Sequence, residues 1–197
     1  MSLIETRRRA EKSAIPVAET LRVFVGWDPR EDEAFEVAKF SLQRRASIPV
    51  EVTPIKLDDL RARGLYVRNQ DPLASTEFTY SRFLTPALAG FKGWALFCDC
   101  DFLWLGDVAG LADYAHGPKA LFCVQHDYRP KETTKMDGAV QTVYPRKNWS
   151  SLMLFNCEHP AVRRLTPAAG AASRRAPRAR ARHSRRSASA RTTARRG

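Results

Sequence analysis

The sequence predicts an α/β protein with a mainly parallel sheet. Short apolar runs rich in Val, Leu, Ile and Phe recur along the chain, and a helical pattern follows the first of them. Strands that alternate with helices form βαβ units, whose successive strands run parallel. The last thirty of the 197 residues contain no Leu, Ile, Val, Phe, Tyr or Trp. We therefore expect the residues before them to form one compact domain.

The first strand and the first helix follow each other near the N-terminus. The run LRVFVGWD at 21–28 is apolar and ends in Gly26 and Asp28, as expected of a buried strand. The segment 29–46 begins with Pro29, carries acidic residues in its first turn and arginines in its last, and predicts a helix. Its helically spaced apolar residues are Ala34, Phe35, Val37, Ala38, Phe40 and Leu42.

The same alternation continues through the rest of the domain. Residues 49–55 alternate in polarity and predict a second strand, and a capping-type start predicts a short helix over 75–88. Further apolar runs predict three more strands. These lie at 93–101, 119–127 and 150–157.

The basic character of the chain is confined to its C-terminal part. The formal net charge is +12, but 12 of the 33 basic residues and none of the 21 acidic ones follow Glu158. Residues 168–197 hold ten Ala and ten Arg and cannot bury a core, which predicts a disordered tail. We therefore expect an N-terminal extension (1–20), a domain (21–167) and this tail (168–197).

Three hypotheses account for the tail. It is an arm for nucleic acid or an anionic membrane, a solvated extension, or the product of a reading-frame shift in a GC-rich coding sequence. The abrupt change of composition after HPAVRRLTP favours the frame shift. The tail has neither Lys nor aromatic residues, which argues against nucleic acid as a partner.

The location and redox state also follow from composition. No run approaches the roughly 20 apolar residues of a membrane span, and no secretion signal is visible at the N-terminus. We expect a cytoplasmic protein without a transmembrane segment, and peripheral membrane association stays open. The cysteines lack the spacing of a zinc site, so buried free thiols are expected. They are Cys98, Cys100, Cys123 and Cys157.

Polar side chains follow three of the predicted strands. Asp28 follows the first strand, Asp99 and Asp101 follow the third, and His126 and Asp127 follow the fourth. In open α/β sheets, ligands bind at the carboxyl ends of the strands. We therefore expect these residues to face a shared crevice.

Asp99 and Asp101 interrupt the apolar run LFCDCDFLWLGD and form a D-x-D pattern. On an extended segment, side chains two residues apart point to the same side, so the two carboxylates offer hard oxygen ligands to Mg²⁺ or Mn²⁺. The alternative is that one Asp caps the following turn and the other forms a surface ion pair. The flanking apolar sequence favours the metal site.

The stretch FTYSRFLTPALAGFKGWALFCDCDFLWLGDVAGL at 78–111 resembles the signature of retaining, family-8-type glycosyltransferases of the GT-A fold. The shared features are an aromatic-rich helix with a central Arg, a strand, the D-x-D and a Gly-Asp that follows an apolar run. The resemblance covers about residues 21–166. It implies a GT-A, Rossmann-like domain that binds a nucleotide sugar.

The resemblance assigns roles by position. Asp99 and Asp101 hold the divalent metal that bridges the donor's diphosphate, and Arg82 contacts the donor. A surface ion pair is the alternative for Arg82. Gly26 and Asp28 match residues that receive the nucleoside.

The segment RKNWSSLMLFN at 146–156 is similar to the small-polar turn and strand of the same family. It places Asn148 and Ser150 as sugar contacts, although Trp149 is inserted and Ser151 stands where Gly is usual. A turn with a strand cap is an equal alternative.

The implied reaction is the metal-dependent transfer of a hexose from a nucleotide sugar, expected to be UDP-linked, to a glycan or lipid-linked acceptor. Family members complete the metal shell with a His from a C-terminal segment, where this chain has only the tail. We therefore expect a domain that is incomplete at its C-terminus, with weak or absent turnover. The alternatives are a metal-dependent phosphohydrolase that uses Asp99 and Asp101, and a non-catalytic nucleic-acid-binding protein with a basic tail.

Overall fold

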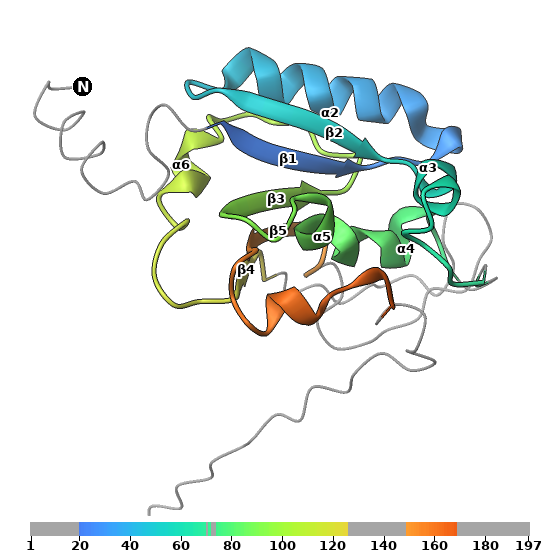
Figure 1. Cartoon of the computed structure of the whole chain (residues 1–197). Helices are drawn as coiled ribbons and strands as arrows, with labels where there is room; N and C mark the ends of the chain where they lie inside the picture. Colours follow the sequence, from blue (N-terminus) through green and yellow to red (C-terminus); the bar gives the residue numbers. More distant parts are fainter. Residues whose placement is uncertain (1–19, 70, 72–73, 126–148, 169–197) are drawn as a thin grey trace, which may run out of the picture.

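A computed structural model describes residues 20–69, 71, 74–125 and 149–168 (Figure 1). Within them, five strands form one sheet in the order β2-β1-β3-β5-β4. Each strand lies inside a predicted apolar run, so the α/β class is confirmed. The strands are β1 (Leu21–Gly26), β2 (Val50–Ile55), β3 (Trp94–Cys98), β4 (Leu121–Cys123) and β5 (Leu152–Asn156).

The sheet is mixed, so the prediction of a mainly parallel sheet is right for one part of it. β1 pairs in parallel with β2 and with β3, whereas β5 pairs antiparallel with β3 and with β4. In this sheet β5 therefore runs against the other four strands. Apolar periodicity reports which face of a strand is buried and carries no information about its direction.

The longest described helix is α2 (Asp32–Arg45), which follows a turn of 3-10 helix, η1 (Pro29–Glu31). Together they occupy the segment predicted as a helix over 29–46. Two short helices, α3 and α6, were not predicted from the sequence. The other helical segments are α3 (Leu57–Ala62), α4 (Phe78–Ser81), η2 (Arg82–Leu84), α5 (Thr85–Leu88), α6 (Ala109–Ala112) and η3 (Val162–Arg164).

The helix predicted over 75–88 is broken into α4, η2 and α5, and Pro86 explains the break. In a continuous helix the backbone nitrogen of residue 86 would donate to the carbonyl of Arg82, but proline has no N–H. The hydroxyl of Thr85 donates to that carbonyl instead, at 2.8 Å. The segment therefore passes through a turn of 3-10 helix at this point, and the side chain of Arg82 in that turn is buried.

The helices cover the two faces of the sheet. Figure 1 shows α2 along β1 and β2, with α4 and α5 on the opposite side of the sheet. α2 buries Phe35, Ala38 and Leu42. On the other face, the side chain of Arg22 in β1 donates to the carbonyls of Ala89 and Lys92 after α5.

The strand directions bring one edge of the sheet to the site. The carboxyl ends of β1 and β3 and the amino end of β5 lie at this edge, because Cys98 pairs with Leu152. The backbone nitrogen of Asp99 donates to the carbonyl of Ser151 at 2.9 Å and continues this pairing past the end of β3. Residues that follow β1, follow β3 or precede β5 are therefore neighbours.

Several predictions concern the chain as a whole. The four cysteines are free thiols, and Cys98, Cys100 and Cys157 are buried. Among the described residues no helix is both long and apolar enough to cross a membrane. The boundaries at 20/21 and 167/168 stay predictions, because residues 1–19 and 169–197 lie outside the described ranges.

Candidate functional site

Three segments of the chain meet at the carboxyl edge of the sheet around Arg82. Its Nη1 donates to Asp99 Oδ1 at 2.8 Å and to the carbonyl and hydroxyl oxygens of Ser150 at 3.0 and 3.3 Å. Asp99 follows β3 and Ser150 precedes β5, so these bonds tie together the ends of two paired strands. We call Arg82, Asp99 and Ser150 the Arg82 cluster, and all three were predicted as site residues.

Arg82 is fixed by aromatic rings as well as by hydrogen bonds. Its Nε donates to the carbonyl of Phe78 at 3.1 Å, and its guanidinium carbon lies 5.2 Å from the ring centroids of both Phe78 and Phe97. The residue is only 8% exposed. Arg82 does form the ion pair that the alternative predicted. The pair is largely buried, however, so its predicted position on the surface is wrong.

The carboxylate of Asp99 lies in an environment that disfavours its charge. Burial raises the pKa of Asp99 to about 7 in spite of the neighbouring Arg82, and the carboxylates of Asp101 and Glu31 act in the same direction. One guanidinium therefore does not compensate for the partly buried negative charge. The described residues donate no hydrogen bond to Oδ2 of Asp99, since the bond from Arg82 goes to Oδ1.

Asp101 is exposed and lies in a turn, because β3 ends at Cys98 and the chain bends at residues 100–101. The expectation that Asp99 and Asp101 lie on an extended segment is wrong. Their carboxylates still act on each other, since the charge of Asp101 raises the pKa of Asp99. The two side chains therefore share one electrostatic environment.

The two carboxylates fit a hard divalent cation in their chemistry and in their number. Among the described residues, no group of three or more His, Cys, Asp or Glu side chains is placed to hold a metal ion. Mg²⁺ commonly takes only one or two protein carboxylates and completes its shell with water and substrate phosphates. Two carboxylates are thus as many protein ligands as Mg²⁺ commonly takes.

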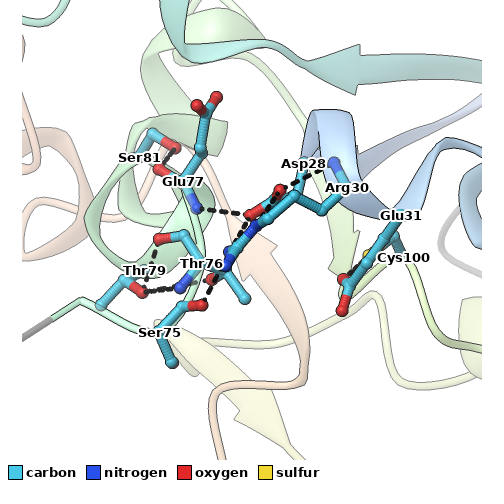
Figure 2. A network of polar contacts seen from close by, with 9 residues as sticks. All are labelled: Asp28, Arg30, Glu31, Ser75, Thr76, Glu77, Thr79, Ser81 and Cys100. Carbon is cyan, nitrogen blue, oxygen red and sulfur yellow. Dashed lines mark hydrogen bonds and ion pairs between the residues drawn. The ribbon is translucent and has the colours of Figure 1, made fainter. Parts of the chain in front are cut away.

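Asp28 forms a second junction at the same edge (Figure 2). Its Oδ1 accepts from the backbone nitrogen and Nε of Arg30 at 3.1 and 2.8 Å, and its Oδ2 accepts from Nη2 of Arg30 at 2.7 Å and from the nitrogen of Glu77 at 3.2 Å. Nη2 of Arg30 also donates to the carbonyl of Ser75. Asp28 thus connects the end of β1 to the segment that leads into α4.

The hydrogen bonds of Asp28 decide its charge. The side-chain bond from Arg30 lowers the pKa of Asp28 to about 2, although burial acts against this. Asp28 is fully buried and is ionised across the physiological range. Each of its oxygens already accepts two hydrogen bonds, so the geometry assigns it first to holding the segment of residues 75–77 against β1.

Gly26 is required by the packing of Phe78. A Cβ built on Gly26 would lie 2.5 Å from two atoms of the Phe78 ring, closer than real contacts allow. The close approach to Gly26 in this structure is therefore made by an aromatic side chain of α4. The predicted contact with a nucleoside stays a prediction.

The remaining predicted residues lie outside the described ranges. Asn148 was predicted as a sugar contact, and His126 and Asp127 as residues of the crevice. All three fall within residues 126–148.

Two polar contacts beside the site were not predicted from the sequence (Figure 2). Glu77 lies at the Asp28 junction, and burial together with the charge of Asp28 raises the pKa of its side chain. The buried thiol of Cys100 donates to Oε2 of Glu31 at 3.0 Å, and burial raises the pKa of Cys100 well above its usual range. The Asp-Pro-Arg start of the helical segment was the available signal for the junction, whereas the thiol contact joins residues 69 apart and left none.

Comparison with known proteins gives one strong sequence relative. No protein-family model matches the chain. Protein CDI of Arabidopsis thaliana is 61% identical to it over 146 residues, which cover 74% of this chain and 56% of the plant protein. The chain thus spans little more than half the length of this relative.

The similarity to solved structures is weak. Two crystal structures of the glycosyltransferase GlyE from Streptococcus pneumoniae TIGR4, one of them the apo form, match with a TM-score of 0.43 at 17% and 18% identity. Each match covers 71% of this chain and 34% of GlyE. A similarity this weak does not establish a function, so the function is inferred from the site residues.

Proposed function

We propose that this domain binds a nucleotide sugar and a divalent cation at the carboxyl edge of its sheet and serves the transfer of a hexose. The observation that carries the proposal is the Arg82 cluster, which brings together residues 82, 99 and 150 from three separate segments. The sequence resemblance had singled out these positions as donor or metal contacts. A GT-A type of fold belongs to the same proposal.

Asp99 and Asp101 are the residues that would hold Mn²⁺ or Mg²⁺. The bond from Arg82 fixes one oxygen of Asp99 and leaves Oδ2 for the ion. When bound, the cation supplies positive charge that stabilises the leaving diphosphate. The two carboxylates act electrostatically in this proposal and form no bond to the sugar.

Arg82 acts chiefly as a positioning residue. The residue is only 8% exposed and its guanidinium carbon lies 5.2 Å from the centroids of two rings, which leaves little of its surface for a bound phosphate. By holding Asp99 and the turn at Ser150, it keeps the ends of β3 and β5 in register. We assign the hydroxyl of Ser150, which lies at the same edge, to contact with the sugar.

The Asp28 junction shapes the neighbouring part of the same edge. Asp28 holds the backbone of residues 75–77 close to β1, and the packed pair of Gly26 and Phe78 lies directly beside it. We assign this region to the nucleoside. UDP is the expected nucleotide, and a glycan or a lipid-linked molecule is the expected acceptor.

The test of the reaction is hydrolysis and transfer with UDP, GDP and CMP sugars, each with and without Mn²⁺. Release of free hexose from one class of nucleotide sugar, dependent on the metal and lost in Asp101→Asn, is the expected result. The matched control is Asp58→Asn, because Asp58 is an exposed carboxylate on α3 with a 91% exposed side chain. Turnover that is equally low in Asp101→Asn and in the parent, with every sugar, would contradict a catalytic role.

A further inference from the structure

The outer face of α2 carries a stripe of four exposed residues, Glu33, Val37, Phe40 and Arg44. Val37 and Phe40, two of the helically spaced apolar residues, are 52% and 67% exposed. Glu33 and Arg44 are exposed at the two ends of the stripe and form no ion pair within the described part of the chain. Two large apolar side chains one turn apart on a water-facing helix form an exposed patch that a partner would cover.

The stripe is symmetric about its own centre, which lies between Ala38 and Lys39. Val37 and Phe40 stand at equal distances from this point, and so do Glu33 and Arg44. The acid lies on the N-terminal side and the base on the C-terminal side. A second α2 laid antiparallel on the first therefore places each Glu33 against an Arg44 and each Val37 against a Phe40.

The spacing of the stripe suits a helix pair. Its four residues are separated by four, three and four positions, which is the a/d spacing of a coiled coil. Helices that pack along such a seam cross at about 20°. This shallow angle keeps the charged ends of two antiparallel helices within reach of each other, because the end residues lie only about 8 Å from the centre along the axis.

We propose that two copies of this chain associate through α2, with the two-fold axis at the centre of the stripe. The interface consists of two Val37–Phe40 contacts flanked by two Glu33–Arg44 ion pairs. Asp32 and Arg45 occupy symmetric positions one residue further out, on the flanks of the stripe, where Asp32 also accepts a hydrogen bond from Trp27 Nε1. The charge pattern thus specifies a second copy in antiparallel orientation.

The loop after β3 widens the apolar surface beside α2. Leu103 and Leu105 are 60% and 76% exposed. The backbone nitrogen of Trp104 between them donates to the hydroxyl of Ser41 at 3.1 Å, which fixes the loop against α2. This contact places the loop against α2 one helical turn from Val37.

The charges of α2 also favour a second copy of the chain over a lipid surface as the partner of this face. Helices that lie on anionic membranes carry Lys and Arg along their polar face. Here two acids and two bases, Asp32, Glu33, Arg44 and Arg45, cancel along the stripe and its flanks. A neutral, symmetric pattern favours another α2 over a bilayer.

The test uses the full chain and charge reversals at the two ends of the stripe. The parent is expected to show a concentration-dependent dimer in sedimentation equilibrium. Glu33→Arg and Arg44→Glu each place like charges at both ion pairs, and each is expected to weaken the dimer about ten- to a hundredfold. Asp59→Arg is the control, because Asp59 is an exposed acid on α3 and leaves α2 unchanged.

Two combinations of these substitutions test the antiparallel orientation of the two α2 helices. An equimolar mixture of Glu33→Arg and Arg44→Glu restores both ion pairs and is expected to form a heterodimer. The double variant Glu33→Arg/Arg44→Glu is expected to form homodimers again. It also carries both unfavourable helix-end charges, so its recovery cannot arise from a more stable α2.

A parent that stays monomeric at the highest attainable concentration overturns the proposal, as does a dimer that none of these substitutions weakens. Weakened single variants without recovery in the mixture or in the double variant overturn the antiparallel pairing. Binding of the parent to anionic vesicles without dimerisation assigns the surface to lipid instead. None of these results depends on sugar-nucleotide binding.

Discussion

Arg82 and Asp99 form an ion pair of 2.8 Å at the edge of the sheet, and both side chains are largely shielded from water, with exposures of 10% and 20%. The pair joins a broken helical segment to the end of β3. Its carboxylate keeps a raised pKa even with this partner. Removing the guanidinium therefore raises the pKa of Asp99 further, so that the carboxyl takes up a proton and the ion pair is lost.

The first prediction concerns this pair. Arg82→Ala is expected to lower the free energy of unfolding by about 2–4 kcal/mol, because Asp99, Ser150 and the carbonyl of Phe78 all lose the donor that binds them. Asp99→Asn removes the charge itself and is expected to cost less. Urea unfolding of both variants and of the double variant measures the coupling. Additive losses would show that the two side chains stabilise the fold independently.

Asp28 predicts a stability change at low pH. Its pKa of about 2 in the folded state lies below the ordinary 3.8. The unfolded chain therefore binds the proton more tightly, and the contribution of Asp28 is present above pH 4 and is lost as the pH falls toward 2. The shift corresponds to about 2 kcal/mol. In Asp28→Asn this part of the pH dependence should be missing, as measured by urea unfolding between pH 2 and 5.

Gly26 offers a way to separate packing from ligand contact. Gly26→Ala places a methyl group against the Phe78 ring and is expected to lower the free energy of unfolding by about 1–3 kcal/mol. Phe78→Leu in the same chain should recover part of this loss. If Gly26→Ala keeps full stability and loses only nucleotide binding, Gly26 serves the nucleoside and the packing explanation fails.

The sequence predicted well those elements whose pattern is local. β1, the helical segment from Pro29 to Arg45 and β2 agree with their predicted ranges to within two residues. Their signals are alternation, a proline at the helix start and charges at the helix ends, all of which act over a few positions.

Features that depend on contacts across the chain were not predictable in this way. The reversed direction of β5 follows from its pairing with β3. The burial of Arg82 depends on Phe97, a strand residue that no local pattern places beside it. The exposure of Val37 and Phe40 could not be predicted, because helical spacing identifies an apolar stripe but not whether that stripe faces the sheet or the solvent.

In the proposed function, Asp99 and Asp101 hold a metal ion whose coordination shell is completed by a nucleotide diphosphate. Thermal unfolding with UDP, with Mn²⁺ and with both tests it most directly, because a ligand raises Tm only when it binds the folded chain. We expect a clear rise of Tm with UDP and Mn²⁺ together, little rise with either alone, no rise in Asp101→Asn and an unchanged rise in Asp58→Asn. A rise that needs no metal, or that persists undiminished in Asp101→Asn, would contradict it.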